Sequence, residues 1–231
     1  MPLRDEIQRL GWNSLTALDE SHDYYTFTKR VWRFVDRVVR EGRRFSFRNI
    51  NTGTRVDQHL LLERSQRYET RYLTSSAFQH FVTVFEDYLF GLLRAWLAAY
   101  PASLSKKQIE FGTLLKAGQV DLVVRSVVDK ELNELKYERV ADWFAYLEKL
   151  VKLGCPNPAI IEQLAEIKAT RDILVHNQGI ANATYISKSG ALARCREGEE
   201  LTLPETYHRA SWQTIRSLVQ DMTTAAVSKA G

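Results

Sequence analysis

Apolar residues recur every three or four positions through most of this 231-residue chain, and this spacing places them on one face of an α-helix. The pattern is clearest within residues 55–100, where Pro101 ends it because proline cannot continue a helix. The apolar positions there include Phe78, Phe81, Val82, Phe85, Leu89 and Leu92. The spacing predicts an all-α protein, a helical bundle, rather than a sheet-based fold.

Glycines, prolines and capping residues divide the rest of the chain into further predicted helices. We expect them over residues 14–41, 105–117, 120–136, 137–153, 158–178 and 205–228, with an interruption of the long helix near residues 75–76. Asn157 suits the start of the 158–178 helix and Gly179 suits its end. Two short runs around Glu197 and Gly198 predict a small β-hairpin over residues 192–203. Because we find no repeat or linker, we expect one all-α domain over residues 1–231.

Composition excludes several classes of protein. Hydrophobic residues make up 45% and charged residues 26% of the chain, as in a folded globular protein rather than a disordered one. Two cysteines are too few for a disulfide scaffold or a four-cysteine zinc site. The most apolar stretch, residues 88–100, contains Arg94 and is shorter than the roughly 20 residues of a membrane span. Since the first residues also lack an apolar signal sequence, we expect a soluble cytoplasmic protein with no membrane partner.

Motifs for metal and nucleotide binding are missing from the sequence. None of the five histidines lies three or four positions from another, and there is no H-E-x-x-H or C-x-x-C motif. Glycine-rich phosphate loops and the G-x-S-x-G elbow of hydrolases do not occur either. We therefore expect neither a metal site nor a cofactor.

The helix predicted over residues 158–178 carries an arginine in its apolar seam. Position 171 belongs to that seam, whose other members are Ile160, Leu164, Ile167 and Leu174. A guanidinium in an apolar seam is costly unless it is paired or faces a solvated cleft. Arg171 is therefore either part of a structural salt bridge or a functional group.

A histidine occupies the last turn of the same predicted helix. His176 lies four residues after Asp172, so the two share a helix face and are within reach of a hydrogen bond. Such a histidine suits proton transfer near neutral pH, and the alternative is a histidine that caps the helix end. Arg171 and His176 are about 140° apart on an ideal helix. They meet if the arginine side chain reaches forward, if the helix loosens near its end, or across the two-fold axis of a dimer.

The run from Arg171 to His176, followed by Asn177 and Gly179, resembles the R-x4-H motif of the HEPN superfamily. Members of that superfamily are all-α domains built around a four-helix core. They are commonly dimers, and many are metal-independent endoribonucleases of toxin and antiphage defence systems. The resemblance covers residues 72–186, which would be a HEPN-like core with extra N-terminal helices. Toxins of the superfamily that are silenced by nucleotidyltransferase antitoxins usually carry a tyrosine where this chain has Gln178, so the abortive-infection type is the closer match.

The resemblance implies cleavage of RNA by attack of its own 2′-hydroxyl, without a metal or cofactor, to leave 2′,3′-cyclic phosphate ends. His176 would be the general acid or base, Arg171 would stabilise charge on the phosphate, and Asp172 would orient the histidine. Asn177 either holds a phosphate oxygen or ends the helix. The resemblance also implies a homodimer with a composite active site, and an antitoxin or another defence-system protein as a further partner.

A basic stripe is predicted on the first long helix. It consists of Arg30, Arg33, Arg37, Arg40 and Arg44, at offsets of three and four. Residues 29–48 hold eight basic residues against Asp36 and Glu41, so their local charge of +6 exceeds the +4 of the whole chain. Phe45 and Phe47 interleave with these cations, a combination that suits single-stranded nucleic acid. The alternative to RNA contact is an ordinary solvated helix face.

Two further carboxylates are candidates for the site. Glu86 and Asp87 lie on the 55–100 helix, where they either face the helix that carries Arg171 or are simply solvated.

The competing function is a non-enzymatic helical module that binds RNA, a nucleotide or a partner protein, in which Arg171 is structural. A third reading makes the R-x4-H spacing a coincidence in an unrelated helical protein.

Overall fold

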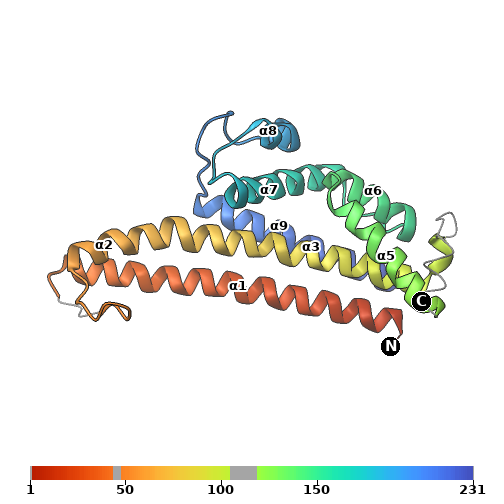
Figure 1. Cartoon of the computed structure of the whole chain (residues 1–231), viewed down its shortest axis with the longest axis horizontal. Coiled ribbons are helices and arrows are strands. Elements are labelled where there is room, and N and C mark those ends of the chain that lie inside the picture. Colours follow the sequence, from red (N-terminus) through yellow and green to blue (C-terminus); the bar gives the residue numbers. More distant parts are fainter. Residues whose placement is uncertain (1, 44–47, 105–118, 231) are drawn as a thin grey trace.

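A computed structural model describes residues 2–43, 48–104 and 119–230 and shows an all-α protein (Figure 1). Its α-helices are α1 Leu3–Arg40, α2 Gln58–Arg67, α3 Thr74–Ala99, α5 Val120–Lys136, α6 Val140–Val151, α7 Pro158–His176, α8 Ala183–Ser189 and α9 Glu205–Lys229. A π-helical segment, Tyr68–Leu73, joins α2 to α3, and short 3-10 turns lie at Pro101–Leu104 and Gly190–Leu192. The prediction of an all-α class is confirmed.

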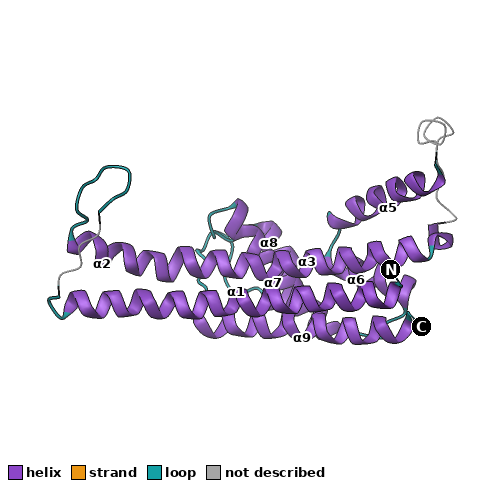
Figure 2. Ribbon diagram, turned by 90° about the horizontal axis from the view of Figure 1, so that it is seen from below, coloured by secondary structure: helices purple, strands orange, loops and turns teal. Residues whose placement is uncertain are grey.

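Three long helices form the base of the molecule. Helix α1 runs antiparallel to α3 and packs along both α3 and α9, so the two ends of the described chain lie close together (Figures 1 and 2). Helix α7 lies across α3 and α9, with α6 against one part of it and α8 against another. This arrangement holds α7 over the middle of α3, where the candidate site forms.

The core consists of apolar side chains at the positions that the sequence pattern predicts. All six apolar positions predicted for the middle of α3 are buried, and they belong to one apolar cluster with side chains from α1, α5, α6, α7 and α9. Trp96, Trp143 and Phe144 are in the same cluster. In the described part of the chain, no helix has the length and apolar character needed to cross a membrane.

Helix α1 begins eleven residues before the predicted start at residue 14, at Leu3. The added segment includes Gly11, which lies against Thr223 of α9. A Cβ atom at Gly11 would come within 2.4 Å of the Thr223 hydroxyl oxygen. Gly11 is therefore a packing residue of α1, where a larger side chain would collide with α9.

Both predicted ends of α7 are confirmed. The Asn157 side chain accepts a hydrogen bond of 3.1 Å from the Ile160 backbone N–H, and Pro158 occupies the first turn. At the other end, Gly179 has a φ of +82° and its N–H donates to the Ile173 carbonyl at 2.9 Å. Gln178 is left-handed as well, with a φ of +54°, so these two residues turn the chain away about two helical turns after Arg171 and Asp172.

Two local predictions are wrong. Residues 192–203 are all described and form no β-hairpin, although a turn does lie at Glu197 and Gly198. Residues 199–201 instead pair with the segment that follows α7. The Leu201 N–H donates to the Gly179 carbonyl at 2.8 Å, and the Ala181 N–H donates to the Glu199 carbonyl at 2.9 Å. The predicted break near residues 75–76 is absent, and the irregular segment is the π-helical Tyr68–Leu73. The helix predicted over residues 105–117 lies outside the described residues.

Candidate functional site

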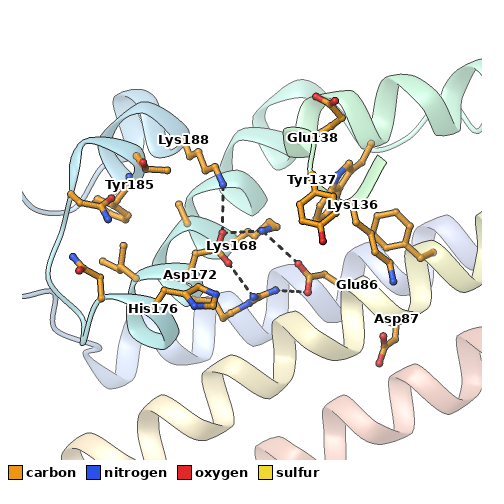
Figure 3. A pocket seen from close by; sticks show the side chains of 18 of the residues that line it. Glu86, Asp87, Lys136, Tyr137, Glu138, Lys168, Asp172, His176, Tyr185 and Lys188 are labelled. Atoms are coloured by element: carbon orange, nitrogen blue, oxygen red, sulfur yellow. Dashed lines mark hydrogen bonds and ion pairs between the residues drawn. The ribbon is translucent and has the colours of Figure 1, made fainter. Parts of the chain in front are cut away.

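The last turns of α7 form one wall of a cavity of about 810 Å³. Arg171, Asp172, His176 and Asn177 all line it, so the structure brings the four predicted site residues together. Helix α3 supplies the opposite wall, helix α8 closes one side and residues 136–138 close another (Figure 3). The sequence places these side chains by simple means: the cap at Asn157 and the turn at Gly179 fix where α7 starts and stops.

Arg171 is held by two carboxylates. Its guanidinium donates to Glu86 on α3, and it lies 3.0 Å from Oδ1 of the adjacent Asp172. The Arg171 side chain is only 17% exposed, and its buried Nε has no hydrogen-bond partner among the described residues. Arg171 therefore satisfies the condition that an arginine in an apolar seam must be paired, and it also reaches the cavity.

Two lysines extend this arrangement into what we call the ionic cluster: Glu86, Lys168, Arg171, Asp172 and Lys188 (Figure 3). Lys168 Nζ donates to Asp172 Oδ2 at 2.9 Å and lies 3.7 Å from Glu86 Oε1. Lys188 reaches in from α8, and its Nζ lies 3.7 Å from Asp172 Oδ2. Three cations thus share two carboxylates, which leaves the ionic cluster with one excess positive charge.

Glu86 is a largely buried carboxylate of the ionic cluster, with a side chain that is 22% exposed. Burial raises its pKa above the ordinary value, and the nearby Arg171 and Lys168 cations offset part of that rise. Of the two α3 carboxylates that the sequence offered, Glu86 thus faces α7 and contacts it directly. Asp87 lines the cavity without contacting Arg171.

His176 is exposed at the C-terminal end of α7, with its ring at the edge of the cavity (Figure 3). The predicted hydrogen bond from the His176 ring N–H to Asp172 is not formed, because Lys168, Arg171 and Lys188 surround the Asp172 oxygens. His176 makes no hydrogen bond within the described part of the chain. Its imidazole is consequently free to meet a group that enters the cavity.

Asn177 ends helix α7. Its side-chain amide donates to the Ile180 carbonyl at 2.6 Å, and its backbone N–H donates to the Ile173 carbonyl. Of the two roles considered for Asn177, the geometry matches the helix-ending one, although the residue also lines the cavity.

The ionisable side chains that line the cavity balance in sign. The basic ones are Lys136, Lys168, Arg171 and Lys188, and the acidic ones are Glu86, Asp87, Glu138 and Asp172. An anion such as a phosphate therefore competes with carboxylates for Arg171. Either the anion displaces one carboxylate, or additional positive charge comes from outside this chain.

The arginine stripe of α1 is separate from this cavity, because none of its described members lines it. Arg33 donates to Glu69 at 2.7 Å and to Glu205 at 3.3 Å, and Arg40 donates to Asp36 at 2.7 Å. Arg30 and Arg37 are exposed and lack an ion pair within the described residues, and Arg30 lies over the Phe27 ring. Arg44, Phe45 and Phe47 lie outside those residues. Half of the four described arginines are thus already neutralised.

Sequence reasoning missed the two lysines of the ionic cluster. Lys168 lies one helical turn before Asp172, and that spacing alone predicts an ion pair. Lys188 carried no such signal, since it lies on α8, a short helix that the sequence analysis did not predict.

Within the described residues, no group of three or more His, Cys, Asp or Glu side chains is placed to hold a metal ion. Comparisons with protein-family models, with curated proteins and with solved structures found no match to the chain. The site must therefore be interpreted from its own geometry.

Proposed function

We propose that this chain is a HEPN-type endoribonuclease that cleaves RNA without a metal. One observation carries the proposal: Arg171 and His176, the two defining residues of the R-x4-H motif, both line one open cavity of about 810 Å³. That cavity has room for a nucleotide and lies in the size range of ligand sites in proteins. A motif that arose by chance has no reason to place both side chains on one cavity.

The chemistry proposed for the cavity needs only side chains. The 2′-oxygen of the RNA attacks the adjacent phosphorus and its proton passes to a base. The bond from phosphorus to the 5′-oxygen breaks, and that oxygen takes up a proton from an acid. The products are a 2′,3′-cyclic phosphate and a 5′-hydroxyl. His176, which is exposed and free of hydrogen bonds within the described residues, exchanges a proton with one of these oxygens. Arg171 stabilises the charge that builds on the phosphate.

Asp172 has a different role from the one that the motif implies for it, and it shares that role with Glu86. Both contact the Arg171 guanidinium, so they hold it at the cavity wall rather than orient His176. We propose that substrate binding exchanges one of these carboxylates for a phosphate oxygen. Since burial raises the pKa of Glu86, this carboxyl loses its charge more readily than an exposed one when the arginine turns away.

A homodimer completes the proposal. The charges around the cavity balance in one chain, and a second copy facing it would add a second Arg171 and His176. Among the described members of the stripe, the exposed Arg30 and Arg37 are available for RNA. A toxin or antiphage role, with an antitoxin or another defence protein as partner, follows from the motif alone.

The second candidate function is a HEPN-like module that binds a ligand and does no chemistry. The pairing of Arg171 with Glu86 favours it, because a buried ion pair of this kind also serves structure. In that case Arg171→Ala lowers the free energy of unfolding and no RNA is cleaved by the parent chain.

Cleavage of a mixed single-stranded RNA by the purified chain in EDTA separates the two. We expect Arg171→Ala and His176→Ala to lose cleavage by 100-fold or more, in the range of a lost acid–base or charge-stabilising group. Arg216→Ala is the matched control, since Arg216 pairs with Asp19 at 2.8 Å and lies outside the cavity. Both site variants cleaving as fast as the control would refute the nuclease.

A further inference from the structure

A second, smaller cavity of about 280 Å³ adjoins the first. The two cavities share Glu138, Lys168, Ala169 and Lys188 as common lining residues, so they meet at these side chains. Its other walls come from the start of α6, the middle of α7, and the chain from the end of α8 through Gly190–Leu192.

The second cavity has more apolar than polar lining surface, although Glu138, Arg139 and Glu162 also line it. Val140, Ile161, Ala165 and Leu192 contribute to the apolar surface. A cavity of this size and lining suits a small group with apolar surface, because removal of such a surface from water is favourable.

One buried polar atom interrupts the apolar wall. Ser189 lines the cavity, its side chain belongs to a residue that is 5% exposed, and its Oγ has no hydrogen-bond partner among the described residues. A buried hydroxyl without a partner is unfavourable, and such a group in a folded protein calls for an explanation. The Ser189 oxygen is itself enclosed, so a ligand with a polar edge supplies the missing partner once the side chain rotates toward the cavity.

Two lysine side chains lie at the boundary between the two cavities. Lys168 and Lys188 line both, and each ammonium lies within 3.7 Å of the shared Asp172 carboxylate. A phosphate at this boundary would meet both lysines, while a group attached to it would extend into the apolar cavity. A nucleobase meets these requirements, because it is small, has apolar faces and a polar edge, and is attached to a phosphate in a nucleotide.

We propose that the second cavity is a base-binding subsite, which takes the nucleobase of the RNA nucleotide whose phosphate lies in the first cavity. Ser189 reads the edge of the base, and Lys168 and Lys188 hold its phosphate. The identification of the ligand as part of an RNA strand rests on the proposed function. The subsite makes RNA cleavage selective for one base rather than indifferent to sequence.

Binding of the four ribonucleoside 3′-monophosphates to the full chain, measured by calorimetry, tests the subsite without any cleavage. We expect at least one to bind, Ala165→Phe to abolish binding by filling the cavity, and Ser189→Ala to weaken it about tenfold. Ala159→Phe is the matched control, because Ala159 lies on the same helix, is exposed and does not line the cavity. Thermal melting confirms that each variant is folded.

The outcomes separate the subsite from the nuclease. Binding that survives Ala165→Phe unchanged, or no binding of any of the four nucleotides to the parent, overturns the subsite. If nucleotides bind and Ala165→Phe removes them, the subsite stands even where the parent cleaves no RNA, and only the nuclease fails. For a chain that does cleave, His176→Ala should lose cleavage and keep nucleotide binding.

Discussion

His208 on α9 is fully buried, stacked on Tyr25 with ring centroids 3.9 Å apart and edge-on to Phe81. This burial lowers its pKa from 6.5 to about 4, with His22 and Lys29 acting in the same direction and Glu205 against it. Below pH 6.5 the unfolded chain takes up a proton at this residue that the folded chain does not. The free energy of unfolding therefore decreases as the pH is lowered from 6.5 to about 4.

The size of this effect follows from the pKa difference. At about 1.4 kcal/mol per pKa unit, His208 alone lowers the free energy of unfolding by about 3 kcal/mol between roughly pH 7 and pH 4. His208→Phe keeps a flat ring against Tyr25 and removes the titrating group, so the variant should lose about 3 kcal/mol less than the parent over that range. Urea unfolding at the two pH values measures the difference.

A control variant makes this test specific. His59→Phe also removes an imidazole from the chain, but at an exposed position on α2. The reasoning is refuted if the parent and His208→Phe lose the same free energy of unfolding on acidification.

Three further changes test the packing around α7 and α1, each by urea unfolding. Glu166→Ala removes a buried carboxylate that accepts hydrogen bonds from three hydroxyls, including Tyr207 at 2.6 Å, and should cost about 3 kcal/mol or more; a loss below about 1 kcal/mol would contradict this. Gly11→Ala should destabilise by about 1–3 kcal/mol, because its Cβ would lie 2.4 Å from the hydroxyl oxygen of Thr223, and an unchanged midpoint would show that the helices separate freely. Asn157→Ala should cost about 1 kcal/mol through loss of the α7 cap, whereas Asn157→Asp should keep most of the stability.

Local signals predicted the helices well. The apolar spacing and the caps placed α5 at its observed bounds, Val120–Lys136, and located both ends of α7. Errors arose where a distant contact outweighs the local preference. Gly11 is tolerated within a helix because α9 packs there, and the run ending at Leu201 pairs with Gly179 instead of with its neighbour in sequence.

Local sequence signals likewise identified only some residues of the candidate site. Arg171, Asp172 and His176 could be singled out because they lie on one helix and their spacing sets their relative directions. Glu86 lies 85 positions from Arg171 in the chain, and no local pattern states that the two will meet. The pairing of Asp172 with lysines rather than with His176 depends on Lys188, which reaches the site from another helix.

The ends of the RNA fragments test the central claim most directly. Purified parent chain, in EDTA, should cut a single-stranded RNA to leave 2′,3′-cyclic phosphate and 5′-hydroxyl ends by mass spectrometry. A 2′-deoxy nucleotide at the cleaved position should block the cut, and His176→Ala should leave the RNA intact. Fragments with 3′-hydroxyl and 5′-phosphate ends, or equal cleavage of the deoxy substrate, would contradict the account.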